Sequence, residues 1–288
     1  GGMITLIGGR SQLGQCLIPI STLPLSILTS ENLDLRKTSK ISSVLKNDKN
    51  KYLINFSAFN DVESSEYDED AFLINHLAVK ELAKHCAENN KVFIHISSDY
   101  VFDGLQGGYV ESDHINPINK YGESRALGEQ AVQDFANNFI ILRTSWLYSH
   151  LPTEYNFLNK VSRLLLKDGQ VLEGAYDSLG SPTSALSLAH AINHMLEHLI
   201  KNNNIFNRIF HYSDVGQISR FNFLEEIANQ LNKKFHLSNI IKPVSNASFN
   251  LNAPRPKDTS LNSDLFEKTF DYKRLEWDTA LRNILKKV

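Results

Sequence analysis

The sequence predicts an α/β protein with a Rossmann-type, doubly wound parallel sheet and a smaller C-terminal region. Through the first half of the chain, short apolar runs alternate with longer segments whose apolar residues follow a helical spacing. A glycine-containing turn at 8–14 follows the first apolar run, and the polar residues 97–99 follow a later one. Because ligands bind at the carboxyl ends of the strands in open parallel sheets, both segments are expected at one edge of the sheet.

The strands expected in the first half are short apolar runs bounded by polar or turn residues. They lie at 4–7, 25–29, 52–56, 92–96 and 139–142. Apolar residues spaced three or four positions apart predict helices between them, at 12–20, 71–89 and 121–135. This alternation favours a parallel sheet with helices on both of its faces.

The alternation loosens after about residue 146, so we divide the chain there into two regions, 3–146 and 147–288. Helices are expected in the second region at 156–167, 185–200 and 221–231. One late strand, 208–212, belongs either to the second region or to the main sheet. Residues 246–260 contain two prolines and predict an ordered loop.

Composition and charge exclude several classes of protein. The chain has 288 residues, 42% of them hydrophobic, and a net charge of −2. The small net charge argues against nucleic acids and anionic membranes as partners, and no apolar run reaches the roughly 18 residues that span a bilayer. Cys16 and Cys86 are the only cysteines, and they favour a cytoplasmic location. No metal-ligand spacing is evident, so no metal is expected.

The turn from Gly8 to Gly14 joins the first expected strand to the first helix. Such a turn lets the backbone approach a pyrophosphate at a helix N-terminus, so we interpret 3–146 as an NAD(P)-binding Rossmann domain. The alternative for the turn at 8–14 is a plain strand-to-helix turn without a ligand. The alternative for residue 34 is a turn that faces solvent. The residues expected at the cofactor are Gly8, Arg10, Ser11, Gln12, Leu13, Gly14, Asp34, Leu35, Ser57, Ala58 and Phe59, with the adenine beside Asp34 and Leu35.

Two residues bear on which dinucleotide binds. The second strand ends without an acidic residue at its tip, and Glu31 lies just beyond it, where it could accept a hydrogen bond from a ribose 2′-hydroxyl. Arg10 could instead bind a 2′-phosphate. The balance favours NADPH, with NADH as the other candidate.

A hydroxyl, a phenol and a cation follow the fourth strand in a recognisable order. Ser98 falls at the carboxyl end of that strand, Tyr121 opens the next helix, and Arg125 lies one turn further along the same helix face. These are the parts of a short-chain dehydrogenase active site, in which the cation is usually lysine. Tyr121 and Arg125 are also expected to contact the cofactor.

The chain resembles dTDP-4-dehydrorhamnose reductases, which are extended short-chain dehydrogenases, along nearly its whole length. Matching motifs occur in the family's order at 12–15, 97–104, 116–122, 127–129, 143–148, 177–183 and 255–261. The resemblance implies that NADPH delivers a hydride to C4 of a 4-keto-6-deoxy sugar carried on a nucleoside diphosphate. It also implies that 147–288 is mainly a substrate-binding region, and it leaves a homodimer open.

The resemblance assigns roles to individual residues. Tyr121 would give its phenolic proton to the developing alkoxide, and Ser98 would hold the same oxygen by a hydrogen bond. Asp99 and Trp146 would contact the sugar nucleotide. Arg255, in the late motif, would contact a phosphate or form a local salt bridge.

Two positions depart from the family pattern. Ser11 stands in place of the middle glycine of the cofactor loop, and Arg125 stands in place of lysine. In general, a nearby cation favours the ionised form of a phenol, and arginine keeps the positive charge of lysine on a larger, planar group. Two interpretations stay open: Arg125 replaces the lysine, or the protein is a non-catalytic nucleotide-binding regulatory subunit. A sugar-nucleotide epimerase or dehydratase, which would retain NAD tightly, is a further alternative.

Overall fold

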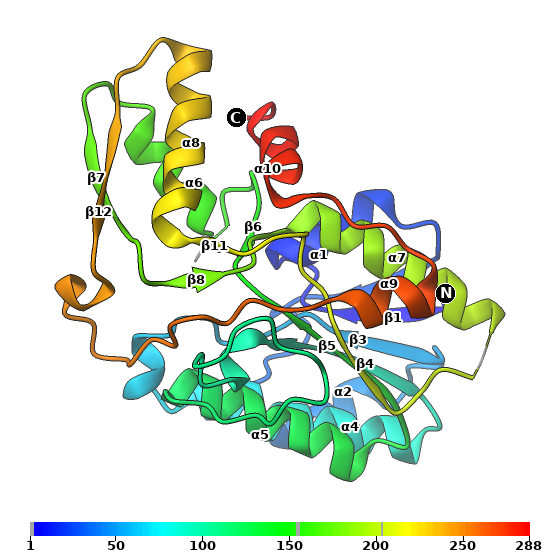
Figure 1. The fold of residues 1–288 in the computed structure, drawn as a ribbon. Helices are drawn as coiled ribbons and strands as arrows, with labels where there is room; N and C mark the ends of the chain where they lie inside the picture. The colour runs from blue at the N-terminus through cyan, green and yellow to red at the C-terminus, as the bar shows by residue number, and fades with distance from the viewer. Residues whose placement is uncertain (1–2, 154–155, 203) are drawn as a thin grey trace.

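A six-stranded parallel sheet forms the centre of the computed structural model, which describes residues 3–153, 156–202 and 204–288 (Figure 1). The strand order is β10-β5-β4-β3-β1-β2. The strands are β1 (Ile4–Ile7), β2 (Leu25–Leu28), β3 (Tyr52–Asn55), β4 (Val92–Ser98), β5 (Asn138–Thr144) and β10 (Arg208–His211). Every pairing within this sheet is parallel, which confirms the predicted fold class.

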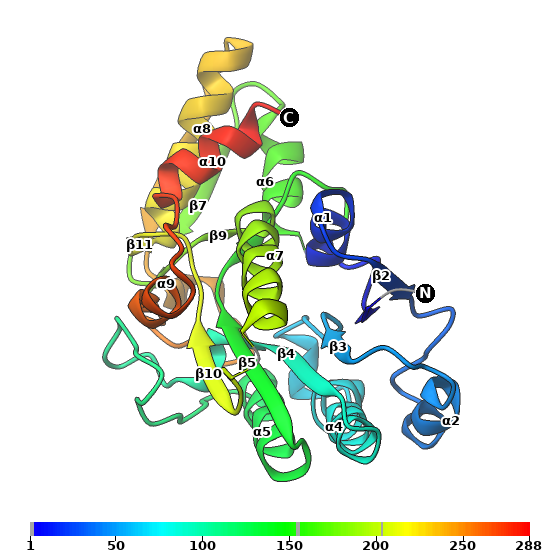
Figure 2. The same cartoon turned by 90° about the vertical axis from the view of Figure 1, so that its right-hand side faces the viewer.

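Helices cover both faces of the sheet (Figure 2). On one face, α1 (Gln12–Ile20) packs against α7 (Ala185–Lys201). The other face is covered by α2 (Ile41–Leu45), α4 (Ala78–Glu88) and α5 (Lys120–Phe135). Strands β1, β3 and β4 are buried along their whole length, because apolar side chains on both faces pack against these helices.

Strand β10 comes from the second half of the sequence but lies in the main sheet, at its edge beside β5 (Figure 2). Residues Arg208–His211 pair with Ile140–Arg143 of β5. Helix α9 (Asp264–Phe270), which the sequence pattern did not predict, adds Phe266 and Phe270 to the core on the α7 face. The sheet layer is therefore built from both sides of the boundary expected at residue 146.

A second, smaller layer forms around α8 (Arg220–Phe235). Two strands absent from the sequence prediction, β7 (Val171–Ala175) and β12 (Ile240–Val244), pair in parallel and pack against α8. Helices α6 (Phe157–Leu165) and α10 (Trp277–Leu285) close the apolar core of this layer. This layer lies above the carboxyl edge of the main sheet in Figure 1.

The helix expected at 71–89 is irregular. It consists of a short α3 (Asp70–Phe72), a π-helical turn over Leu73–Leu77, and α4. The side chain of Asn75 in the π turn accepts a hydrogen bond from the backbone N–H of Phe59 and donates one to the Phe59 carbonyl oxygen. The irregular turn thus anchors the loop that follows β3, and such turns often occur at functional sites.

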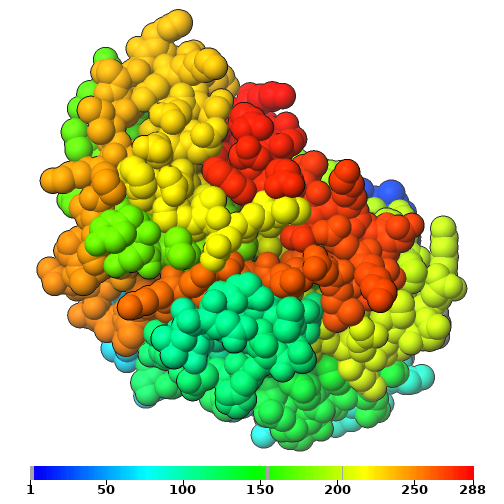
Figure 3. Space-filling model, in the orientation of Figure 1, coloured from blue at the N-terminus to red at the C-terminus, as the bar shows by residue number. Residues whose placement is uncertain are grey.

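Short elements connect the two layers. Strand β6 (Leu147–Tyr148) pairs with β9 (Thr183–Ser184), and β8 (Leu179–Gly180) pairs with β11 (Ile218–Ser219). Single helical turns lie at Thr38–Lys40, Ser64–Glu66, Asp99–Val101 and Asn246–Phe249. After the last of these turns, the expected ordered loop runs between the layers and forms the orange band across Figure 3.

Within the described residues, no helix has both the length and the apolar character needed to cross a membrane.

Candidate active site

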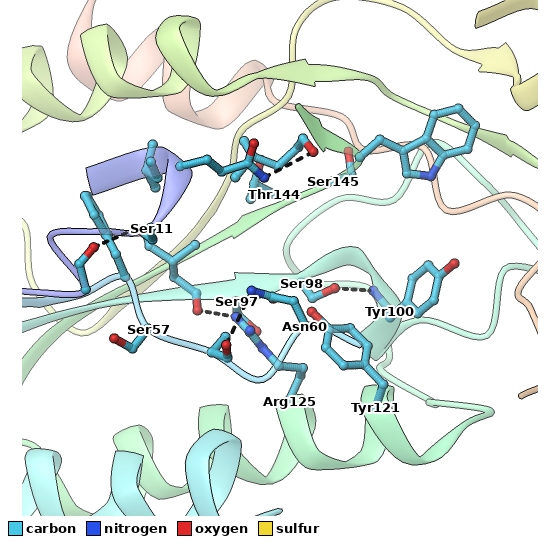
Figure 4. Close-up of a pocket in the computed structure, with 18 of the residues that line it drawn as sticks. Ser11, Ser57, Asn60, Ser97, Ser98, Tyr100, Tyr121, Arg125, Thr144 and Ser145 are labelled. Carbon is cyan, nitrogen blue, oxygen red and sulfur yellow. Dashed lines mark hydrogen bonds between the residues drawn. The ribbon is translucent and has the colours of Figure 1, made fainter. Parts of the chain in front are cut away.

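The loops after β1 and β3 meet at the carboxyl edge of the sheet. Strand β1 lies between β2 and β3, and the helices that follow β1 and β3 cover opposite faces, so the strand order reverses at this point. A Cβ atom on Gly8 would lie 2.9 Å from the backbone nitrogen of Ser57, so the two loops touch. A cavity of about 680 Å³ opens here, and part of its lining is shown in Figure 4.

Gly8 and Gly14 give the glycine loop a tight backbone that other residues would strain. Gly8 has a φ of +88°, which L side chains rarely adopt. A Cβ atom on Gly14 would lie 2.4 Å from the carbonyl oxygen of Gly8, so glycine there lets the first turn of α1 close onto the loop. Gly8 and residues 10–13 line the cavity, whereas Gly14 supports the loop from outside the lining. A dinucleotide pyrophosphate fits this cradle at the N-terminus of α1.

Ser11, in place of the middle glycine, caps α1. Its Oγ accepts a hydrogen bond from the backbone N–H of Gly14 (3.0 Å) and donates one to the carbonyl oxygen of Gly8 (2.7 Å). The hydroxyl therefore stabilises the loop from within.

Arg10 and Glu31 form an ion pair at the end of the cavity beside β2. Nη1 of Arg10 lies 2.9 Å from Oε1 of Glu31, and both side chains are well exposed to solvent. Arg10, Thr29 and Ser30 line the cavity next to this pair.

Besides Gly14, three residues expected at the cofactor lie outside the cavity lining. Asp34 forms a two-point hydrogen bond with Arg36, and Leu35 is buried in the core beneath α2 and α4. Phe59 is held by Asn75, while its neighbours Ser57 and Ala58 do line the cavity.

Ser98, Tyr121 and Arg125 line the same cavity and lie close together in Figure 4. Ser98 is the last residue of β4, and the other two lie in the first turns of α5. All three side chains are more than nine-tenths buried. The start of α5 is fixed by Asn119, whose side chain accepts a hydrogen bond from the backbone N–H of Gly122 (2.8 Å). The structure thus brings together the catalytic groups predicted from sequence.

The guanidinium of Arg125 is held in place beside Tyr121. Its Nη2 atom donates to the carbonyl oxygen of Ile96 at 2.5 Å, and its Cζ atom lies 5.8 Å from the centre of the Tyr121 ring. The adjacent Ser124 donates to the Tyr121 carbonyl and accepts from Asn75. Arg125 therefore supplies a fixed positive charge at the position expected for lysine.

Asp99 is buried behind Ser98. Its Oδ2 atom accepts a hydrogen bond from Thr259 at 2.5 Å, which ties the late motif at 255–261 to the end of β4. Burial raises the pKa of Asp99 to about 6, although hydrogen bonds from Thr259 and Ser98 and the charge of Arg220 oppose this shift.

Trp146 forms the wall of the cavity on the side of the smaller layer. Its backbone has a φ of +45°, and Gly180 packs against its ring so closely that a Cβ atom there would lie 2.3 Å from the indole. The guanidinium of Arg220, the first residue of α8, lies 3.7 Å from the centre of the Trp146 ring and 4.5 Å from that of Phe157. Trp146, Phe157 and Arg220 all line the cavity.

Sequence reasoning missed Arg220. It belongs to none of the motifs and is separated from Trp146 by two helices and several short strands. Among the described residues, no carboxylate forms an ion pair with it, and burial lowers its pKa to about 10, so it stays charged at neutral pH. An unpaired cation in a cavity is suited to bind an anionic ligand.

Arg255 also reaches the cavity, and it forms the local salt bridge considered from sequence. Its Nη2 atom lies 2.8 Å from Oε1 of Glu63. Its Nε atom is buried and has no hydrogen-bond partner among the described residues. The guanidinium therefore keeps a donor for a ligand in the cavity.

Three further buried polar atoms on the cavity lining have no partner in the described structure: Oγ1 of Thr144, Oγ1 of Thr153 and Oε1 of Gln12. Buried polar atoms are nearly always hydrogen-bonded, so unpaired ones that line a cavity point to a polar ligand. Within the described ranges, no group of three or more histidine, cysteine or acidic side chains converges as metal ligands.

These features define a class: a Rossmann-type fold whose cavity is lined by a serine, a tyrosine and a cation in the order expected for a short-chain dehydrogenase. A family model described as "RmlD substrate binding domain" matches residues 2–288. The chain belongs to this family and is an oxidoreductase, which confirms the resemblance drawn from its motifs.

Individual relatives agree along the full length. A dTDP-4-dehydrorhamnose reductase of Sinorhizobium fredii is 30% identical, with 98% of this chain and 96% of the relative covered. The reductase of Aggregatibacter actinomycetemcomitans is 28% identical, with 98% and 97% covered. The crystal structure of dTDP-4-dehydrorhamnose reductase from Bacillus anthracis in complex with NADP superposes with a TM-score of 0.87, at 26% identity and 99% coverage of both chains.

Proposed function

We propose that this protein reduces the C4 keto group of a nucleotide-linked 4-keto-6-deoxy sugar with NADPH, as a dTDP-4-dehydrorhamnose reductase. The observation that carries the proposal is that one cavity holds both the glycine loop and the group of Ser98, Tyr121 and Arg125. Similarity to reductases over the whole chain supports it.

The bound nicotinamide supplies the hydride, and the side chains of the protein manage the proton and the developing charge. The phenol of Tyr121 donates a proton to the carbonyl oxygen as it becomes an alkoxide. Ser98 holds the same oxygen through its hydroxyl. The guanidinium of Arg125, beside the ring of Tyr121, stabilises the negative charge that remains on the phenolate oxygen. The ketone, NADPH and one proton give the alcohol and NADP⁺.

Charged and aromatic groups at the other end of the cavity suit a nucleoside diphosphate. Nε of Arg255 has no hydrogen-bond partner among the described residues, and the guanidinium of Arg220 lies over the Trp146 ring. Guanidinium groups bind diphosphates with paired hydrogen bonds. Trp146 offers an apolar face to the sugar, and Asp99 offers a buried hydrogen-bonding group.

The test is the loss of NADPH absorbance when the protein is mixed with dTDP-4-keto-6-deoxy-mannose. Turnover by the wild type is expected, and Tyr121→Phe is expected to lower kcat by roughly 100- to 10,000-fold because a general acid is lost. Tyr100→Phe is the matched control, since Tyr100 lines the same cavity and packs edge-on against Tyr121.

The outcomes separate the alternatives. NADPH binding without turnover on this sugar would favour a regulatory nucleotide-binding subunit. Tightly retained NAD with sugar conversion and no net use of reduced cofactor would indicate an epimerase or dehydratase. Equal rates for wild type and Tyr121→Phe would remove Tyr121 as the proton donor.

A further inference from the structure

Glu63, in the loop after β3, holds a short stretch of the late loop beside the cavity. Its carboxylate accepts three hydrogen bonds from residues 252–255. The backbone N–H groups of Asn252 and Ala253 donate at 2.9 and 3.3 Å, and Nη2 of Arg255 donates at 2.8 Å. Of the described residues in this group, Arg255 lines the cavity and Glu63 does not, so Glu63 can act on a ligand only through its partners.

Two further contacts attach the same loop to the elements that carry the catalytic groups. The side chain of Asn119, which caps α5 next to Tyr121, donates a hydrogen bond to the carbonyl oxygen of Pro254 at 2.9 Å. The hydroxyl of Thr259 donates to Asp99 at the end of β4. The loop is therefore fixed on both sides of the arginine that Glu63 binds.

Arg255 keeps a donor for a ligand while it is held in this way. Its Nη2 atom donates to Glu63, whereas its Nε atom is buried and has no hydrogen-bond partner among the described residues. Its charge also acts on the phenol of Tyr100, which packs edge-on against Tyr121. An arginine side chain has several rotatable bonds, so a carboxylate that fixes its guanidinium reduces the entropy lost when an anion binds.

We propose that Glu63 is a positioning residue for the diphosphate of the sugar nucleotide. It holds Arg255 so that the unpaired donor of the guanidinium stays at the cavity, and it raises the affinity for the diphosphate without contacting it. The inference rests on the proposed function, because it requires that the cavity binds a nucleoside diphosphate.

Charge and position predict opposite results when the carboxylate of Glu63 is removed. A carboxylate repels a nearby diphosphate, so on charge alone its removal would tighten binding. Because Glu63 orders Arg255, its removal frees that long side chain, and the cost of ordering it again when the ligand binds lowers the affinity. The direction of the change therefore distinguishes positioning from simple repulsion.

The experiment measures the dissociation constant of dTDP by calorimetry, with no coenzyme and no sugar present. Glu63→Gln is expected to weaken dTDP binding about three- to tenfold, which is the effect of ordering one long side chain. In this variant an NH2 group replaces one of the two oxygens and repels the donors that converge there. Glu63→Asp keeps the charge on a shorter side chain, so it should also weaken binding.

A double variant tests whether the effect acts through Arg255. Arg255→Gln is expected to weaken dTDP binding about tenfold or more, because a charge-assisted hydrogen bond is lost. In that background, Glu63→Gln should change the dissociation constant by less than about twofold. In assays with NADPH and the sugar nucleotide, Glu63→Gln should raise KM and leave kcat within about twofold, since it alters binding and not the chemical step.

Glu267→Gln is the matched control. Glu267 pairs with Arg274 at 2.7 Å, its side chain is 32% exposed like that of Glu63, and neither of these two described residues lines the cavity. Binding of dTDP to the control should stay within about twofold of wild type.

Three results would overturn the proposal: tighter or unchanged dTDP binding in Glu63→Gln, wild-type affinity in Glu63→Asp, or a loss that persists in the Arg255→Gln background. A fall in kcat without a rise in KM would also contradict it, because the damage would then lie in the catalytic groups. Failure of the wild-type protein to bind dTDP would instead overturn the proposed function, and with it any role for Glu63.

Discussion

Two arginines of this protein, the buried Arg143 and the partly exposed Arg220, lie in opposite environments. Arg143, on β5, forms a two-point ion pair with Glu129 of α5, with nitrogen–oxygen distances of 2.7 and 2.9 Å. Ser97 donates to the same carboxylate, and the third guanidinium nitrogen lies 3.1 Å from Nε2 of His211. Arg220, on α8, lies against the ring of Trp146 and has no ion-pair partner among the described residues.

This difference distinguishes an ion-pair network that holds the fold together from a group of side chains that can bind a ligand. The Glu129–Arg143 network joins α5 to β4, β5 and β10, and its charged groups are matched within the protein. Arg220 interacts electrostatically with Asp99 but forms no ion pair within the described residues, and the cavity it lines also contains the unpaired Nε of Arg255. Guanidinium donors that lack a carboxylate partner and line a cavity are suited to bind an anionic ligand.

The largest expected effect comes from breaking the matched network. Arg143→Met leaves the carboxylate of Glu129 buried without its partner, so the free energy of unfolding should fall by about 3–5 kcal/mol in urea denaturation. Arg282→Met is the control, because Arg282 forms a half-exposed pair with Asp278 and its loss should cost less than about 1 kcal/mol. A loss below about 1 kcal/mol for Arg143→Met would mean that the network is not a scaffold.

On the cavity side, Asp99 should make stability depend on pH. Its pKa of about 6 in the folded state lies above the unfolded value, so the folded state binds more protons between about pH 4 and pH 6. The contribution of protonated Asp99 to the free energy of unfolding is therefore fully present below about pH 4 and is lost as the pH rises through about 6. The free energy of unfolding of Asp99→Asn minus that of wild type, measured by chemical denaturation, should therefore rise by about 3 kcal/mol from pH 4 to pH 7. Parallel pH profiles for the two proteins would contradict this assignment.

Arg220→Gln should change ligand affinity and leave the fold intact. Loss of a charged donor to a diphosphate should weaken the binding of dTDP by about 1.5–3 kcal/mol, measured by calorimetry. The free energy of unfolding should change by less than about 1 kcal/mol, because no ion pair within the described residues is broken. Arg220→Lys should retain part of the affinity, since it keeps the charge without the planar donor pair. Unchanged dTDP affinity in Arg220→Gln would place the diphosphate elsewhere.

The smallest effect is expected for Arg125→Lys. The positive charge next to Tyr121 is kept, so the activation barrier should change by less than about 1 kcal/mol and kcat should hold or rise. Arg125→Met removes the charge and should lower kcat below that of both wild type and Arg125→Lys. An unchanged kcat in Arg125→Met would show that the charge does not act on Tyr121.

The elements that carry strong local signals were predicted from sequence. Buried strands such as 92–96 are uninterrupted apolar runs, and the order of Ser98, Tyr121 and Arg125 follows from a strand end and a helix start. Strands β7 and β12 gave no such signal because Gly174 and Pro243 interrupt short, half-exposed segments.

Contacts between distant segments could not be predicted. Nothing near Arg220 indicates that α8 begins beside Trp146, because that contact depends on how the smaller layer sits on the sheet. Leu35 is expected beside the adenine, and its side chain lies in a hydrophobic core below the loop, which the sequence did not indicate. Sequence spacing shows which residues share a helix face or a strand end, and it does not show which loops close over them.

The position of β10 has a consequence for how the protein is made. While the chain is being synthesised, β5 is complete long before β10 emerges, and the outer edge of β5 has no strand to pair with during that interval. An unpaired apolar strand edge is a template for association with other chains. A product that ends near residue 146 would keep that edge exposed, so it should aggregate even though it contains the whole glycine loop. The chain must therefore be translated past residue 211 before β10 can pair with β5 and complete the six-stranded sheet.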